Sequence, residues 1–335
     1  MIASLKIASE PMETNVPEIR PGERISCNLR WDTIQPVLSV LVPTFQDAGG
    51  RLFEALSACE RSPDIEVIIY DDGSADQSMT QQLIAAIKNF PGAACLITAE
   101  QNYGRAFGRN RLKALARSNW LLFLDADMVP DNPNFLSRYL TEIEPLTSPA
   151  MIVGGFSLKH AERTKQTELH WAQSETSECL SADSRNQTPG RYVFTSNVLC
   201  HRDIMDSVAF DPAFSGWGWE DVDWGLRVAS RFPVRHIDNT ATHTGLDNPE
   251  TLIRKYTTSG KNFWRLADLH KAAMADTPLF KMASLFSKLP GKTLIQKACE
   301  QIARAPGWIM PVKLRLLALK LLRAAAYGKA RQNVI

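Results

Sequence analysis

Continuous apolar runs alternate with amphipathic segments along the first part of the chain. Four runs are apolar at nearly every position, the pattern of strands that are buried on both faces, and they span residues 37–42, 67–70, 95–98 and 120–124. Apolar residues recur at helical spacing in the segments between them, 51–61, 79–90 and 105–117. This alternation predicts an α/β fold with a mostly parallel sheet flanked by helices, in which ligands bind beyond the carboxyl ends of the strands.

The pattern changes after residue 130. We predict helices over 132–145 and 220–231, strands over 151–155, 192–200 and 234–237, and an irregular polar segment over 157–190. Residues 1–36 contain four prolines and lack periodicity, whereas 251–335 are mostly of helical pattern. We therefore expect an irregular N-terminal arm over 1–36, an α/β domain over 37–250 and a helical extension over 251–335.

Charge divides the chain unevenly. Residues 281–335 contain eleven Lys and Arg against one acid, Glu300, and so carry a net charge of +10. Because the whole chain carries +2, residues 1–280 carry −8. A leucine-rich basic helix over 313–323 suits an anionic membrane surface, and packing on the α/β domain or on a second subunit is the alternative. The acidic body argues against nucleic acid as a partner.

The composition also bears on the compartment. The sequence contains no run of eighteen apolar residues, the length needed to cross a membrane, and its first residues lack the apolar core of a signal peptide. We therefore expect a cytoplasmic protein, peripheral at the inner face of the cell membrane. Six scattered cysteines without CxxC pairing are then expected to be reduced thiols.

Two aspartates, Asp125 and Asp127, follow the strand at 120–124. Residues two apart in an extended chain point the same way, so both carboxylates can face one Mg²⁺ or Mn²⁺ ion. An acidic pair that forms turns is the alternative. His243 follows the last predicted strand and could be a third ligand, which would favour Mn²⁺, although a lone histidine is more often structural.

Other strand ends carry polar groups as well. Asp71 and Asp72 could bind a base and a ribose, whereas Asp76 is expected to cap the next helix. Glycine-rich GxGxxG and Walker patterns are absent, which disfavours a dinucleotide dehydrogenase or a P-loop NTPase.

The run Trp217-Gly218-Trp219 precedes Glu220 and Asp221. Acids in a first helical turn complement the helix dipole, and the tryptophans could be plain core. A mobile aromatic loop that leads to a carboxylate equally suits a site that closes over a sugar and uses a general base.

Five segments together resemble the family 2 glycosyltransferases of GT-A fold: VLSVLVPTF, IEVIIYDDGSAD, QNYGRAFGRNRLKALA, WLLFLDADMVP and GWGWEDVDWGLR. The resemblance divides the α/β domain into a nucleotide-binding half, 37–130, and an acceptor half, 131–250. It implies donor contacts from Pro43, Thr44, Asp71, Asp72, Arg109, Asp125 and Trp217. It also implies a metal site of Asp125, Asp127 and His243, and a catalytic pair of Glu220 and Asp221 with Asp221 as the base.

The last segment is similar to the WGxED loop of galactosyl- and N-acetylgalactosaminyltransferases, including chondroitin-polymerase-like bacterial domains. The implied activity is metal-dependent, inverting transfer of a hexose from a UDP-sugar to a hydroxyl of a glycan or lipid-linked glycan. Gln46 and Trp219 depart from the family pattern, and Trp219 narrows the acceptor mouth. An inactive sugar-nucleotide-binding or scaffold subunit of a polysaccharide assembly system is the alternative, and a nucleotidyltransferase is disfavoured because a basic glycine-rich loop is missing.

Overall fold

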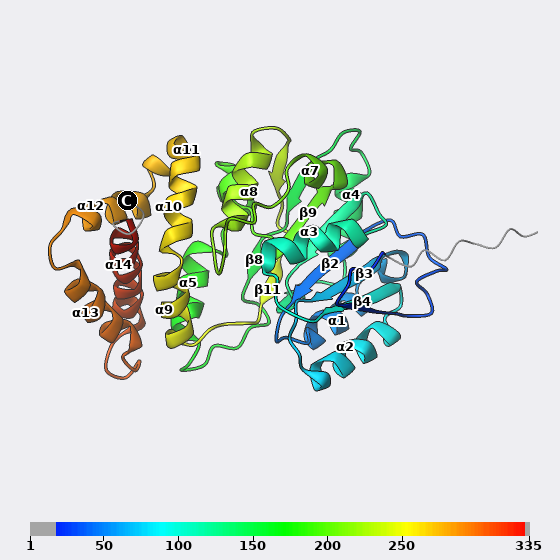
Figure 1. Ribbon diagram of the computed structural model, residues 1–335, viewed down its shortest axis with the longest axis horizontal. Helices are drawn as coiled ribbons and strands as arrows, with labels where there is room; N and C mark the ends of the chain where they lie inside the picture. Colours follow the sequence, from blue (N-terminus) through cyan, green and yellow to red (C-terminus); the bar gives the residue numbers. More distant parts are fainter. Residues whose placement is uncertain (1–17, 332–335) are drawn as a thin grey trace, which may run out of the picture.

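The computed structural model describes residues 18–331 and contains one large twisted sheet (Figure 1). Its eight strands lie in the order β1-β4-β3-β2-β5-β9-β7-β10. The strands are β1 Glu23–Cys27, β2 Ser39–Thr44, β3 Glu66–Asp71, β4 Ala93–Ala99, β5 Trp120–Leu124, β7 Met151–Val153, β9 Asn197–His201 and β10 Val234–His236. Strands β2 to β5 are mutually parallel, while β9 runs antiparallel to both β5 and β7. The predicted mostly parallel α/β sheet is thus confirmed.

Helices cover both faces of this sheet, because the strands are apolar on both sides. Helices α1 Gly50–Ser57, α2 Gln77–Asn89 and α4 Phe135–Ile143 contribute to one apolar cluster. Helices α3 Arg105–Leu115, α7 Arg202–Ser207 and α8 Glu220–Ala229 contribute to the cluster on the opposite face. Asp76 caps α2 as predicted, with its carboxylate accepting from the Met79 amide at 3.0 Å.

Two features differ from the sequence predictions for the arm over 1–36, of which 1–17 lie outside the described residues. First, the arm is not irregular throughout, because it contains β1, which pairs antiparallel with β4. Second, that register sets Cys27 opposite Cys95, and the two form a disulfide. The prediction that all six cysteines are reduced is wrong for this pair, because a separation of 68 positions in the sequence gives no sign that they are close in space.

The segment 157–190 is also more ordered than predicted. It contains α5 Glu168–Ser177, α6 Ala182–Asn186 and the start of the 3₁₀ turn Pro189–Tyr192. Polar residues such as His170, Gln173 and Ser174 are buried in α5, so the segment lacks the apolar periodicity from which we predict helices.

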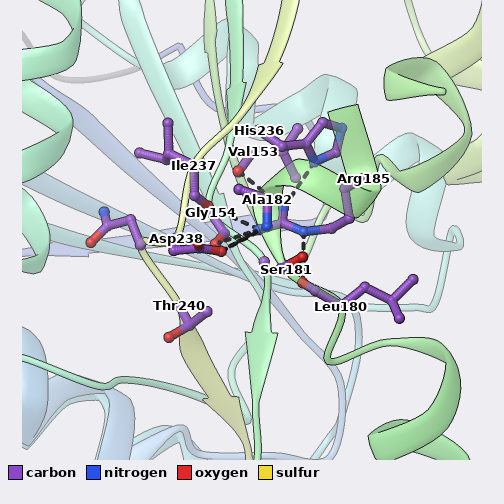
Figure 2. A network of polar contacts seen from close by, with 12 residues as sticks. Val153, Gly154, Leu180, Ser181, Ala182, Arg185, His236, Ile237, Asp238 and Thr240 are labelled. Atoms are coloured by element: carbon purple, nitrogen blue, oxygen red, sulfur yellow. Dashed lines mark hydrogen bonds and ion pairs between the residues drawn. The ribbon is translucent and has the colours of Figure 1, made fainter. Parts of the chain in front are cut away.

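A buried guanidinium fixes α6 to the ends of two strands (Figure 2). Arg185 is fully buried and donates to the carbonyls of Leu180, Val153, Gly154 and Ile237. It also donates to Nδ1 of His236 at 2.8 Å. A polar group this deep is stabilising only when its hydrogen bonds are made, so the network ties 180–186 to β7 and β10.

A second sheet of three short strands lies beyond β5. It has the order β6-β11-β8, with β6 Met128–Pro130, β8 Phe156–Ser157 and β11 Ala241–His243. The buried carboxylate of Asp131 accepts hydrogen bonds from the hydroxyls of Ser157, Thr240 and Thr242. These bonds join segments from three parts of the chain and so fix the register of β11.

The C-terminal part is helical, as predicted. It comprises α9 Pro249–Thr258, α10 Gly260–Leu269, α11 Lys271–Ala275, α12 Pro278–Lys288, α13 Lys292–Arg304 and α14 Val312–Ala330. Helix α14 packs against α12 and α13 and also contacts α5, α9 and α10 (Figure 1). Within residues 18–331, no helix has both the length and the apolar character needed to cross a membrane.

Candidate active site

Two cavities meet at the carboxyl end of β5. The smaller one, of about 290 Å³, is lined by the ends of β2 and β3 and by the start of α3. The larger one, of about 340 Å³, extends from the loop before α8 to the C-terminal helices. Three residues line both cavities: Asp125, Asp127 and Arg105. A ligand held by the two aspartates would therefore face both spaces.

The antiparallel pairing of β11 with β6 brings His243 to the aspartates. His243 is the register partner of Met128, the residue after Asp127. Its Nε2 lies 3.2 Å from Oδ2 of Asp127. Burial alone would lower the pKa of His243, but the Asp127 carboxylate outweighs burial and raises it to about 9. Of the predicted group, His243 thus contacts Asp127 directly, and all three residues, Asp125, Asp127 and His243, line the larger cavity.

Asp127 and His243 are close enough to contact one divalent ion. Two ligand atoms about 2.1 Å from an ion and at right angles to it lie about 3 Å apart, as Asp127 Oδ2 and His243 Nε2 do. Two carboxylates with one imidazole suit Mn²⁺ or Mg²⁺. The backbone of Gly245 packs closely against Asp127, so that a Cβ at this position would lie 2.1 Å from Asp127 Oδ2. Only glycine leaves this carboxylate in place.

Arg109 lies between the predicted metal-binding pair and the predicted catalytic pair. Its side chain is buried, with Nη2 3.3 Å from Asp125 Oδ1 and Nη1 3.7 Å from both Glu220 Oε1 and Asp221 Oδ1. Burial disfavours its charge, but the surrounding carboxylates raise the pKa of Arg109. The permanent charge of Arg109 offsets the repulsion between these three carboxylates, so they can lie close together.

The predicted catalytic pair divides into a partly buried and a buried member. Asp221 lines the larger cavity and accepts two hydrogen bonds from Thr195, from the hydroxyl at 2.9 Å and from the amide at 3.1 Å. Glu220 is buried, and its Oε2 has no hydrogen-bond partner among the described residues. Burial, with the neighbouring Asp221 charge, raises the pKa of Glu220. Asp221 is therefore the better oriented and more accessible of the two carboxylates.

The predicted nucleotide-binding residues lie in and beside the smaller cavity. Pro43, Thr44, Asp72 and Arg109 line it. The carboxylate of Asp72 accepts from the amides of Tyr103 and Gly104, and so fixes the loop that begins α3. Asp71 does not line this cavity, since its carboxylate accepts from the amide and hydroxyl of Ser74 in a turn.

Trp217, predicted among the donor contacts, lines the larger cavity instead. Its ring packs 5.8 Å from that of Tyr256 in α9, with their planes 37° apart. Trp219 also lines this cavity, and its Nε1 donates to the Tyr327 hydroxyl of α14 at 3.0 Å. The aromatic loop is thus anchored on the C-terminal helices.

Sequence reasoning missed several residues of the larger cavity. Arg105 stands one helical turn before Arg109, so helical spacing could have placed both on one face. The local sequence pattern does not mark the others, because they come together only when distant helices pack. They lie in α5 or directly after it, in α9 and in α14: His170, Glu178, Lys255, Tyr256 and Arg323.

His170 and Glu178 lie near enough to His243 for one ion to touch all three. The Nδ1 of His170 accepts from the Asp247 amide at 2.7 Å, so the proton of the neutral ring is on Nε2. An ion would have to displace that proton, just as it would displace the proton that His243 Nε2 donates to Asp127. Burial, the largest influence, lowers the pKa of His170, which keeps the ring neutral.

Comparison with known proteins agrees with this geometry. Residues 39–205 match the profile of the family described as "Glycosyl transferase family 2". The chain is 28% identical over 223 residues to validoxylamine A glucosyltransferase of Streptomyces hygroscopicus subsp. jinggangensis, covering 58% of this chain and 51% of that protein. It is 23% identical over 224 residues to chondroitin synthase of Escherichia coli, covering 57% of this chain and 32% of that protein. The chain thus spans about half the length of the first of these relatives and less of the second.

Two solved structures are similar over most of the chain. The mannosyltransferase PcManGT of Pyrobaculum calidifontis, in complex with GDP-Man and Mn²⁺, has a TM-score of 0.51 at 16% identity, covering 90% of this chain and 88% of that one. S. aureus TarS has a TM-score of 0.50 at 16% identity, covering 88% of this chain and 55% of that one. At such low identity the likeness concerns the fold, and it confirms the expected GT-A architecture.

Proposed function

Because residues 39–205 place this chain in glycosyl transferase family 2, we propose that it moves a hexose from a nucleoside diphosphate sugar to an acceptor hydroxyl, with inversion. The acceptor is a glycan or a lipid-linked glycan. One observation carries the proposal: Asp125 and Asp127 line both cavities, and Asp221 lines the larger. A donor in the smaller cavity would then present its sugar to an acceptor beside a carboxylate.

Asp125, Asp127 and His243 would hold Mn²⁺ or Mg²⁺. When bound, such an ion supplies positive charge for the diphosphate as it departs. The donor is proposed to be UDP-linked, following the resemblance of the WGWED loop to galactosyltransferase loops. A GDP-sugar is the alternative, because the similar mannosyltransferase was solved with GDP-Man.

Asp221 is the proposed base. The acceptor oxygen forms a bond to the anomeric carbon as the bond from that carbon to the diphosphate oxygen breaks, and the leaving diphosphate takes the bonding electrons. The acceptor proton passes to Asp221, whose orientation Thr195 fixes. Attack opposite to the leaving group inverts the anomeric centre, so a single carboxylate is sufficient.

The C-terminal helices are proposed to dock on an anionic membrane. Exposed apolar residues gather in the turn before α14 and on its first turns, beside exposed lysines, and we name this group the hairpin surface: Trp308, Ile309, Lys313, Leu314, Leu317 and Lys320. Trp308 is 86% exposed. Apolar side chains flanked by lysines suit insertion at the level of anionic headgroups.

The test of the enzymatic proposal is a thermal-shift panel of UDP-, GDP- and CMP-sugars, each with Mn²⁺ and with EDTA. Stabilisation by a UDP-sugar that requires Mn²⁺ is expected, followed by donor turnover and an inverted product by NMR. Binding without turnover or hydrolysis would favour the inactive subunit. Binding that EDTA leaves unchanged would contradict the metal site.

A further inference from the structure

Arg323 of α14 reaches the larger cavity through a cage of aromatic rings. Its guanidinium carbon lies 4.3 Å from the ring centre of Tyr256, 4.9 Å from that of Trp219 and 5.5 Å from that of Tyr327. Its Nε donates to the Tyr327 hydroxyl at 3.0 Å. The rings fix the plane of the guanidinium, since a planar cation stacks on aromatic faces.

The charge of Arg323 has no acidic partner. Among residues 18–331, no carboxylate oxygen lies within 4.0 Å of its nitrogens, whereas the inward-facing Arg315 of the same helix pairs with Glu168. Neither Nη of Arg323 is among the buried unpaired atoms of this part of the chain, so both nitrogens keep access to the cavity. Burial disfavours the charge, but the tyrosines around it raise the pKa of Arg323.

One other cation in this part of the cavity is paired, since Lys255 Nζ lies 2.6 Å from Asp247 Oδ2. The Glu178 carboxylate accepts from the Ser174 hydroxyl, and its charge favours that of Arg323 without direct contact. Arg323 is therefore a pre-oriented fork of donors that faces open space and has no acid in direct contact. Such a fork matches the two oxygens of a carboxylate or phosphate.

Resting on the proposed function, we propose that Arg323 binds an anionic group of the acceptor, a carboxylate or a phosphate on the sugar that enters the larger cavity. The tilted pair Trp217 and Tyr256 beside it offers apolar faces for the sugar ring itself. The donor diphosphate is the less suitable partner. Arg323 lines only the larger cavity, whereas Arg105 and Arg109 lie at the smaller one.

The test uses the full chain and small probes that need no turnover. Tryptophan fluorescence is titrated with glucuronate, glucose 6-phosphate and neutral glucose, since Trp217 and Trp219 adjoin the site. We expect both anions, or one of them, to bind roughly tenfold more tightly than glucose, and Arg323→Gln to remove that preference. The arm that responds distinguishes a carboxylate from a phosphate.

The matched control is Arg331→Gln. Arg331 also stacks on a ring, that of Trp264 at 4.3 Å, but lines neither cavity, so its replacement should leave the preference intact. Arg323→Lys keeps the charge without the fork and should retain a weaker preference if Arg323→Gln does not fold. Donor hydrolysis without acceptor reports the proposed function separately and should persist in Arg331→Gln.

Three outcomes would overturn the inference. The wild type could bind glucose as tightly as the anions, or Arg331→Gln could lose the preference equally. Alternatively, Arg323→Gln could weaken binding of UDP with Mn²⁺, which would assign Arg323 to the donor.

Discussion

The carboxylate of Asp221 accepts both hydrogen bonds that Thr195 can donate, from its hydroxyl at 2.9 Å and from its amide at 3.1 Å. Thr195 is fully buried and lies just before β9, in a segment that the sheet holds in place. The proposed base in the first turn of α8 is thus oriented by a residue 26 positions earlier in the chain. In the proposed mechanism two roles are separate: Asp221 takes the proton, and Thr195 orients its carboxylate.

The first prediction follows from that separation. Asp221→Asn should reduce kcat by about 10²–10⁴-fold, because a general base is lost, with donor KM nearly unchanged. Thr195→Val keeps the amide bond and should reduce kcat by roughly tenfold, since a misplaced base is slower. Steady-state kinetics with saturating donor would measure both. Thr141→Val removes a comparable hydroxyl bond on exposed α4 and should have no effect on kcat.

A loss of donor binding in Asp221→Asn equal to its loss of transfer would contradict this assignment. The residue would then belong to the metal site or to the fold.

The second prediction concerns Gly245. A methyl group at this position would stand 2.1 Å from Asp127 Oδ2, so the carboxylate must turn away from His243. We expect Gly245→Ala to weaken Mn²⁺ binding by about 10–100-fold, as the loss of a neighbour that orients a ligand does. Titration of free Mn²⁺ by EPR measures this affinity directly.

Gly50→Ala is the matched control, because a Cβ there meets nothing within 4 Å and the position begins α1. It should bind Mn²⁺ as the wild type does. Unchanged affinity in Gly245→Ala would show that Asp127 is not a ligand.

The sheet was predictable because its signals are local. Each of the four parallel strands is a short apolar run, and Trp120–Leu124 has the predicted bounds. Asp125 and Asp127 followed from their position at a strand end, and Asp76 from the chemistry of helix caps. The contact between His243 and Asp127 depends on a three-residue strand, so its position after the last predicted strand made His243 only a possible ligand, and the family resemblance added the support.

The larger cavity was not predictable for a different reason. Its residues come from helices whose buried faces contain polar groups, such as His170 in α5 and Arg323 in α14. Hydrophobic periodicity reports which face of a helix is apolar, but not that a charged side chain is buried on it. The basic C-terminal segment likewise contains two inward-facing cations, Arg315 and Arg323, which the sequence does not distinguish from its solvated ones. Arg315 pairs with Glu168.

The third prediction is a pH dependence of stability. His236 is buried, and its Nδ1 accepts from Arg185 (Figure 2). Its Nε2 donates to the Pro189 carbonyl. Burial, with the Arg185 charge, lowers the pKa of His236 to about 4. Between that value and the pKa of about 6.5 in the unfolded chain, the unfolded state binds more protons, so stability rises with pH.

This contribution should be complete above pH 6.5 and lost as the pH falls to 4, and it amounts to about 3 kcal/mol. Urea unfolding of the wild type and of His236→Gln at several pH values measures it, because the difference cancels the other titrating groups. The difference in stability between the two proteins should shrink as the medium is acidified. A constant difference would contradict the prediction.

The fourth prediction tests the hairpin surface. Truncation of 281–335 would remove α14, which packs against α9 and α10 and supplies Arg323, so lost function would have no clear cause. Paired replacement of Trp308 and Ile309 by Ser removes exposed apolar area alone. Sedimentation with phosphatidylcholine vesicles containing phosphatidylglycerol should fall about tenfold or more, and added salt should weaken wild-type binding because the lysines contribute.

Leu269→Ser is the control, since Leu269 is similarly exposed on α10 but lies outside the hairpin surface. It should sediment as the wild type does. One helix can face a membrane and also supply Arg323 to the cavity, because its two sides differ. Leu314 and Leu317 face outward, whereas Arg315 and Leu319 are buried on the opposite side. Equal sedimentation of the wild type and the paired variant would leave the outward leucines without a membrane role and would favour a protein partner on that surface.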